Sequence, residues 1–191
     1  GNGGAVLTEI EELADFAQAY STHGKFKGTH VGVGTNSRMS ELDCAHTMIR
    51  AQYLSEWQQR RKEIAKYYIS KLDEQYGMRV LVKNIDTHAL QKFVISLPDW
   101  VNRDKLQHQL ANDDIETRIH YKHPLHEMAC YEQYSSPGII STASSLARTL
   151  ISLPIYPELT DAEVEFIATQ VQHHVFSQIR NVETPIHNSS V

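Results

Sequence analysis

Apolar and polar residues alternate at helical spacing near the start of the chain. Thr8 with Glu11 fits a capping box, and the apolar positions that follow predict one buried helix face: Ile10, Leu13, Phe16 and Ala17. Ala5–Thr8 is predicted to be a short strand after a glycine turn. Residues 21–34 are rich in Gly and Thr without a period, which predicts an irregular loop.

A longer helical pattern follows. Ser40 with Asp43 predicts its N-terminal cap, and the apolar stripe continues to about Tyr76 through Leu42, Ala45, Ile49, Tyr53, Trp57, Ile64, Tyr68 and Leu72. A continuous helix of this length would span about 55 Å. Helices that long usually tie two substructures together, so we expect an interdomain helix here.

Shorter segments follow Gly77. Met78–Val82 and Phe93–Leu97 are predicted strands, and Asn102 is the predicted cap of a helix carrying Leu106 and Leu110. A third strand is predicted where apolar and β-branched residues alternate, at Ile115, Thr117, Ile119 and Tyr121. The pattern therefore indicates a small α/β layer.

The last part of the chain is helical. Residues 141–150 predict a helix and residues 150–159 an extended segment interrupted by two prolines. Thr160 with Glu163 caps a final helix, whose inward positions are Val164, Ile167, Val171 and Val175. The predicted fold class is α/β: a long helix plus a short mixed sheet with flanking helices.

Composition narrows the class of protein. The chain has 191 residues, 41% hydrophobic and 21% charged, with a net charge of −5 and a pI near 6.1. This balance is that of a soluble globular protein and lacks the basic excess of nucleic-acid binders. No apolar run approaches the roughly 18 residues of a membrane span. We therefore expect no nucleic-acid partner, no membrane partner and a cytoplasmic protein.

Cysteine and histidine suggest little chemistry. Cys44 and Cys130 form neither a CxxC motif nor a disulfide framework, which fits a reducing compartment. His120, His123 and His126 recur every three residues, but Pro124 excludes a helix interior there, so their rings should diverge. We expect no metal site.

The segment GVGTNSRMSELDC, residues 32–44, is harder to interpret. Asn36 can simply end a turn, since Asn tolerates unusual backbone angles. Alternatively, Asn36 and Arg38 beside a helix start could bind an anion such as a phosphate. The residues alone leave both interpretations open.

Six segments, taken in order, resemble the nucleotide-sugar aminotransferases of the DegT/StrS type, which use pyridoxal phosphate. GTNSRMSELDCA is similar to that family's G-x-N-[SY]-R-[ML]-x-[ED]-[LI]-Q-A-A segment, and GNGGAVLTE to its G-[DE]-G-G-A-V-V-T strand. The other four are LSEWQQRRKEIAKYYISKL, DTHALQKFVISL, IETRIHYKHPLH and LARTLISLPIYPELTDAEVEFIATQV.

The resemblance implies the C-terminal half of a fold-type I aminotransferase. Residues 1–39 would be a remnant of the large cofactor-binding domain, 40–180 the long helix with the small C-terminal α/β domain, and 181–191 a disordered tail. The resemblance further implies a homodimer.

The resemblance also implies roles for four residues. Asn36 would reach the phosphate of pyridoxal phosphate across the dimer, and Arg38 would lie near cofactor or substrate phosphates. His120 and Tyr121 would approach the nucleotide-sugar substrate.

The family's Schiff-base lysine lies a few residues before the G-x-G-G-A strand, whereas this sequence starts at Gly1, and Lys25 and Lys27 fall in a different context. We therefore expect no catalytic residue in this chain, no tight binding of the cofactor by the chain alone and no catalysis on its own. The alternative is a non-catalytic protein of the same descent that binds a sugar nucleotide or a partner subunit.

Overall fold

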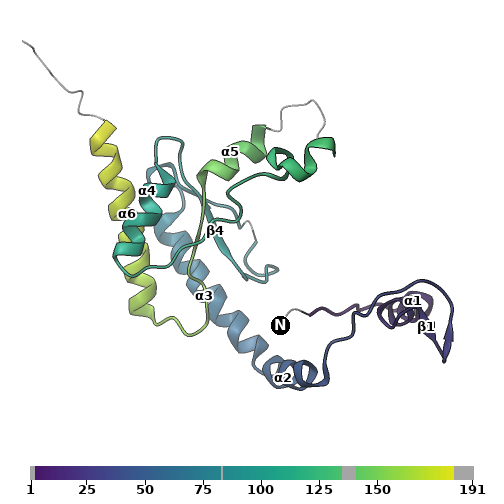
Figure 1. Cartoon of the computed structure of the whole chain (residues 1–191). Helices are drawn as coiled ribbons and strands as arrows, with labels where there is room; N and C mark the ends of the chain where they lie inside the picture. Colours follow the sequence, from purple (N-terminus) through teal and green to yellow (C-terminus); the bar gives the residue numbers. More distant parts are fainter. Residues whose placement is uncertain (1–2, 83, 135–140, 183–191) are drawn as a thin grey trace, which may run out of the picture. The chain divides into compact units, whose positions relative to one another are not determined.

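The computed structural model describes residues 3–82, 84–134 and 141–182 (Figure 1). The chain divides into two compact units, Gly1–Leu54 and Ser55–Val191. Each unit is described below by itself. The predicted boundary between residues 39 and 40 does not coincide with this division, and the assignment of residues 1–39 to a large cofactor-binding domain stays a prediction.

The first unit begins with a helix, α1 (Glu11–Ser21), as the periodicity predicts. The expected strand Ala5–Thr8 is absent: these residues have no regular structure, because no neighbouring segment in the described unit pairs with their backbone. The capping box was also wrong. Ile10 is the N-cap residue and has no side-chain cap, whereas the Thr8 hydroxyl accepts a hydrogen bond from the Ile10 N–H at 3.1 Å.

The predicted irregular loop contains a small hairpin instead. Strands β1 (Lys25–Phe26) and β2 (Thr29–His30) pair antiparallel. The two residues between them, Lys27 and Gly28, both have positive φ, at 47° and 85°. Two-residue loops of this kind match the twist of the flanking strands, so the Lys-Gly dipeptide was the hairpin signal in this segment.

The long predicted helix is two helices, α2 (Glu41–Ala51) and α3 (Leu54–Leu72). Between them the N–H groups of Gln52 and Tyr53 bond to carbonyls three residues back, which tightens the turn and interrupts the α-helical ladder. None of the residues of α2 is buried, whereas Ile64 and Leu72 of α3 lie in the core. One apolar stripe therefore continues across two differently packed helices.

The second unit contains the α/β layer. After α3 come η1 (Gln75–Gly77), β3 (Arg79–Val80), β4 (Phe93–Ser96), α4 (Arg103–Asn112), η2 (Leu125–Glu127), η3 (Ala129–Tyr134), α5 (Ser141–Thr149), β5 (Leu150–Leu153) and α6 (Asp161–Val182). The two caps predicted for this unit, at Asn102 and Thr160, are confirmed. The Asn102 side chain accepts from the Lys105 N–H at 2.9 Å, and Thr160 and Glu163 bond reciprocally at the start of α6.

The sheet has the order β3–β4–β5, and both pairs are antiparallel, so the described sheet is not the mixed one that we expected. The third strand is β5. Residues 115–121 do not form the predicted strand; they meet the sheet at one isolated bridge, between Arg118 and Ser152. Alternation alone could not distinguish a full strand from a segment that pairs at a single residue.

One face of the sheet is buried against helices. Phe93 and Ile95 of β4 lie opposite Leu153 and Ile151 of β5 in register, and all four are buried. This core continues into α3, α4 and α6 through residues that include Tyr68, Leu106, Leu110 and the four predicted positions of α6, Val164, Ile167, Val171 and Val175. The Tyr68 hydroxyl donates to the Pro154 carbonyl at 3.1 Å.

Helix α6 continues through Val182, so the first two residues of the expected disordered tail are helical. The remainder, residues 183–191, lies outside the described residues.

We predict that the two units tolerate leucine truncation very differently. Leu110→Ala removes a side chain that is 0% exposed and should lower the free energy of unfolding by about 2–5 kcal/mol. The matched control, Leu42→Ala, changes a helical leucine that is 81% exposed and should stay within about 0.5 kcal/mol. Urea unfolding followed by circular dichroism measures both; equal losses would contradict the assignment of the core to the second unit.

Candidate functional site

The four predicted site residues are divided between the two units, with two residues in each. Asn36 and Arg38 belong to the first unit, and His120 and Tyr121 to the second. The site residues therefore form two separate pairs, and each pair is described within its own unit.

Asn36 sits in a segment that runs along the C-terminal end of α1. The N–H groups of Thr35 and Ser37 donate to the carbonyls of Tyr20 and Ser21 at 2.7 and 3.0 Å. These carbonyls belong to the last turn of the helix and have no partner inside it. The backbone around Asn36 therefore caps α1 and is held in place by it, with an antiparallel bridge between Thr22 and Asn36.

Two glycines allow this close approach. Gly24 has φ +74°, which disfavours side chains, and a Cβ on Gly34 would lie 2.1 Å from the backbone nitrogen of Gly24. Any larger residue at Gly34 would push the segment away from α1. Gly24 and Gly34 are thus explained by backbone packing, whereas a Cβ on Gly32 would meet no atom within 4 Å.

The side chain of Asn36 is not needed for this packing. The hydroxyls of Thr35 and Ser37 contact each other at 2.6 Å, so alternation in the extended segment puts the Asn36 side chain on the opposite side. Ser40 caps α2, because its hydroxyl accepts from the Asp43 N–H at 3.1 Å. Asn36 and Arg38 are exposed, and among the described residues neither side chain has a hydrogen-bond or ion-pair partner.

His120 lies on the second face of the sheet. Arg118 pairs with Ser152, so its side chain shares that face, as does His120 two residues further on. His120 Nδ1 lies 2.8 Å from the Ser152 hydroxyl. Together with Lys92 these residues line a cleft of about 750 Å³.

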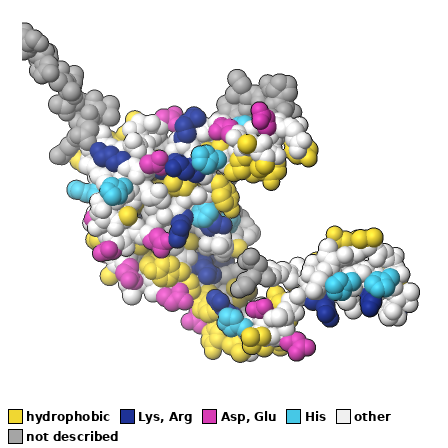
Figure 2. Space-filling model, in the orientation of Figure 1, with side chains coloured by type: hydrophobic (Ala, Val, Ile, Leu, Met, Phe, Trp, Pro, Cys, Tyr) yellow, Lys and Arg dark blue, Asp and Glu magenta, His cyan; other side chains and the backbone are white. Residues whose placement is uncertain are grey.

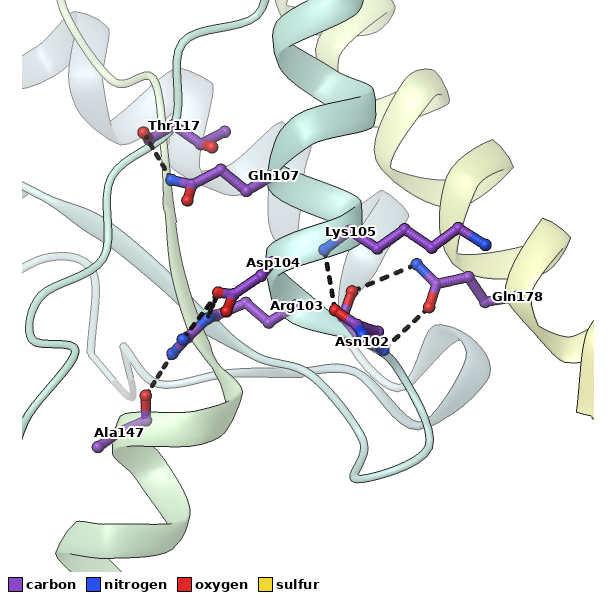
Figure 3. Close-up of polar contacts among 8 residues, drawn as sticks. All are labelled: Asn102, Arg103, Asp104, Lys105, Gln107, Thr117, Ala147 and Gln178. Carbon is purple, nitrogen blue, oxygen red and sulfur yellow. Dashed lines mark hydrogen bonds and ion pairs between the residues drawn. The ribbon is translucent and has the colours of Figure 1, made fainter.

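Helix α4 holds the segment that leads to His120 (Figure 3). The Gln107 amide donates to the Thr117 carbonyl at 3.1 Å, one residue before Arg118. At the start of α4, the buried Arg103 guanidinium bonds to the Ala147 carbonyl of α5, and Gln178 of α6 accepts from the Asn102 N–H at 2.9 Å. The helix is therefore fixed to both neighbouring helices and sets the position of the segment.

The surroundings of His120 lower its pKa. Burial disfavours the charged imidazolium, and the cations Lys92 and Arg118 act in the same direction. A neutral imidazole has one donor and one acceptor nitrogen, so His120 can hydrogen-bond to a ligand without carrying charge.

Tyr121 is 68% exposed, and its ring meets the His120 ring edge-on with centroids 5.5 Å apart. Ser152, Lys92 and Arg118 were not among the predicted site residues. Alternation along residues 116–120 could have indicated Arg118, since it shares a face with His120, but nothing in the sequence pairs that segment with Ser152.

The other residues considered for chemistry are histidines and cysteines. His126 contacts the Ser144 hydroxyl at 3.2 Å, and in the described part of the chain no group of three His, Cys, Asp or Glu side chains is arranged to hold a metal ion. Cys44 and Cys130 are exposed and free. Among residues 3–82, 84–134 and 141–182, no helix has the length and apolar character needed to cross a bilayer.

Comparison with known proteins identifies the class. Residues 1–172 match the family model described as the DegT/DnrJ/EryC1/StrS aminotransferase family. The chain is 31% identical over 175 residues to a dTDP-3-amino-3,6-dideoxy-alpha-D-galactopyranose transaminase of Aneurinibacillus thermoaerophilus, covering 90% of this chain and 47% of the relative. It is 35% identical over 161 residues to a dTDP-3-amino-3,4,6-trideoxy-alpha-D-glucose transaminase of Streptomyces venezuelae, covering 83% and 42%.

The fold agrees with the sequence match. The crystal structure of DesV from S. venezuelae superposes with a TM-score of 0.80 at 31% identity, covering 88% of this chain and 46% of that one. The chain belongs to the DegT/DnrJ/EryC1/StrS aminotransferase family, whose members are pyridoxal-phosphate-dependent and act on nucleotide sugars. The predicted family and fold class are confirmed, and the chain spans about half the length of the relatives it matches.

We predict that Lys92→Ala raises the pKa of His120, because it removes a cation that disfavours the imidazolium. The control is Lys71→Ala, which changes a lysine lying over the Tyr67 ring on α3. The other ionisable groups lining the cleft are Arg118, Tyr156, Asp113, Asp114, Glu116 and Glu163. An NMR pH titration of the His120 ring measures the change; an unchanged or lowered pKa would contradict the electrostatic cause.

The lowered pKa of His120 also makes the stability of the chain depend on pH. The folded chain binds the His120 proton more weakly than the unfolded chain does. The contribution of neutral His120 to the free energy of unfolding is therefore fully present above the ordinary histidine pKa and is lost as the pH falls through the pKa of the folded state. Lys92→Ala should therefore reduce the loss of stability on acidification.

Proposed function

We propose that this chain supplies the C-terminal half of a pyridoxal-phosphate-dependent aminotransferase that transfers an amino group, from an amino acid such as glutamate, to a keto-sugar nucleotide. The observation that carries the proposal is the family match over residues 1–172, which includes both the Asn-x-Arg segment and the His-Tyr pair. The proposed reaction would form amino sugars for surface polysaccharides or deoxysugars.

Asn36 and Arg38 are the proposed cofactor contacts. Their side chains are exposed and have no partner among the described residues, while the backbone that carries them is hydrogen-bonded to the end of α1. An amide and a guanidinium suit a phosphate group, and the guanidinium can donate two parallel hydrogen bonds. Bound there, pyridoxal phosphate would supply the electron sink that amino transfer requires.

His120 and Tyr121 are the proposed substrate contacts. A neutral imidazole and an exposed phenol can donate hydrogen bonds to hydroxyl or phosphate oxygens of a nucleotide sugar. Lys92 and Arg118 line the same cleft and supply cationic groups for a ligand containing a diphosphate, although Arg118 also forms an ion pair with Glu116.

We assign no catalytic residue to this chain, and we propose that it works as a homo-oligomer, most simply a dimer, in the cytoplasm. The support for association is the first unit, on which Figure 2 shows hydrophobic side chains at the surface. Leu7 is 94% exposed and Val33 is 95% exposed.

The reaction is tested with the aminotransferase assembled from this chain and a lysine-bearing N-terminal half of the family. Release of 2-oxoglutarate from glutamate in the presence of a dTDP- or UDP-linked keto-sugar supports the proposal. An assembled protein that binds the nucleotide sugar but transfers no amino group would instead support a non-catalytic binding protein.

We predict that Asn36→Ala and Arg38→Ala in this assembled enzyme weaken cofactor or substrate binding by roughly 1.5–3 kcal/mol, about 10- to 150-fold in Kd, because each removes a hydrogen bond to phosphate. Both should change folding stability by less than about 1 kcal/mol, since neither side chain packs. Ser37→Ala is the matched control, as its hydroxyl contacts Thr35. Equal effects at all three positions, in equilibrium titrations followed by absorbance, would contradict the phosphate assignment.

We also predict that the isolated chain associates. Light scattering after size-exclusion chromatography should give a dimer or larger species, because exposed apolar surface of this extent is rare on monomers. A single species of 21.8 kDa at high concentration would refute the prediction.

A further inference from the structure

Ser152 of β5 makes contacts in three directions. Its backbone N–H donates to the Arg118 carbonyl at 2.7 Å, and its carbonyl accepts from the Arg118 N–H at 3.2 Å. On the other side of β5 it lies opposite Val94 in register. Its hydroxyl lies 2.8 Å from His120 Nδ1. This one residue therefore joins the sheet, the Arg118 segment and the His120 ring.

The direction of the hydroxyl hydrogen bond follows from the available acceptors. Ser152 is only 5% exposed, so its hydroxyl proton needs an acceptor within the protein. Among the described residues, the one side-chain contact of this hydroxyl is His120 Nδ1. If Nδ1 carried a proton, Nδ1–H would donate to the Ser152 oxygen, and the hydroxyl proton would then have no acceptor among the described residues. Donation from Ser152 to an unprotonated Nδ1 satisfies both groups.

The charge state of the ring agrees with this arrangement. Nδ1 can accept a hydrogen bond only while the imidazole is neutral, and burial together with Lys92 and Arg118 lowers the pKa of His120. The neutral ring then has its proton on Nε2.

We propose that Ser152 is a positioning residue for His120: its hydroxyl donates to Nδ1, fixes the orientation of the ring and selects the tautomer that carries the proton on Nε2. His120 then presents a hydrogen-bond donor, and not an acceptor, to a ligand in the cleft. This inference deepens the proposed function, because a donor suits the phosphate and hydroxyl oxygens of a nucleotide sugar. The tautomer itself can be measured without substrate or cofactor, so it can fail or hold independently of the proposed function.

The test is a long-range proton–nitrogen NMR spectrum of the ¹⁵N-labelled 191-residue chain at a pH where His120 is neutral. The His120 signals are assigned as those missing from the spectrum of His120→Gln. In the unmodified chain we expect a single tautomer with the proton on Nε2. A ring protonated on Nδ1 overturns the proposal without any further variant.

Three variants of two serines separate a positioning role of Ser152 from a general effect on the sheet. Ser152→Ala should lose the single-tautomer signature and give a mixture of both forms, and Ser152→Thr, which keeps a hydroxyl, should restore it. The matched control is Ser96→Ala on the neighbouring strand, since Ser96 is also buried, at 4% exposed, but its hydroxyl contacts Thr149 at 3.2 Å. The control should leave the His120 tautomer unchanged.

The outcomes are distinct. A tautomer unchanged by Ser152→Ala overturns the positioning role, and so does an equal change in Ser96→Ala, which would reflect the sheet and not this hydroxyl. Should Ser152→Ala fail to fold, the measurement on the unmodified chain and on Ser152→Thr still decides the direction of the hydrogen bond.

Discussion

The second unit depends on one antiparallel strand pair whose two faces differ. The β4–β5 register puts Phe93 and Ile95 opposite Leu153 and Ile151, and burial of this face against α3, α4 and α6 is the main apolar contribution to the fold. Because side chains alternate along a strand, the other face must then carry Val94 and Ser152. Packing of the core thereby decides which side of the sheet is available for polar chemistry.

That second face collects the charged and polar groups around His120. Arg118 joins it through a single backbone bridge, and the Ser152 hydroxyl and Lys92 come from two different strand regions. The segment carrying His120 pairs with the sheet at a single backbone bridge. The hydrogen bond from the Gln107 amide of α4 to the Thr117 carbonyl also holds this segment in position (Figure 3). The two cations and the hydroxyl that act on the neutral imidazole therefore come from elements far apart in the sequence.

The first unit is stabilised in another way. Ala19 is the one apolar side chain buried among its described residues, so this unit has almost no hydrophobic core. Backbone hydrogen bonds between α1 and the segment around Asn36 hold it together. The close approach of Gly24 and Gly34 makes these bonds possible. The consequence is a unit with defined local structure whose apolar side chains are largely exposed.

Local patterns in the sequence determined several helix caps, one buried helix face and the family. Capping at Ser40, Asn102 and Thr160, the inward positions of α6 and the family itself could all be predicted, because each depends on residues within a few positions of one another or on ordered motifs. The Lys27–Gly28 hairpin was missed although its information is also local.

Long-range pairing was decided only by the tertiary structure. The same apolar stripe gave two helices instead of one, since only α3 has a core to pack against, and the alternating segment at 115–121 became a single bridge because β5 took the place of the third strand. The sequence by itself determined which residues could form helices, caps and the Asn-x-Arg and His-Tyr motifs. Only the folded chain decided that Ser152, Lys92 and Arg118 surround His120, because side-chain alternation specifies a face but not which neighbouring strand will share it.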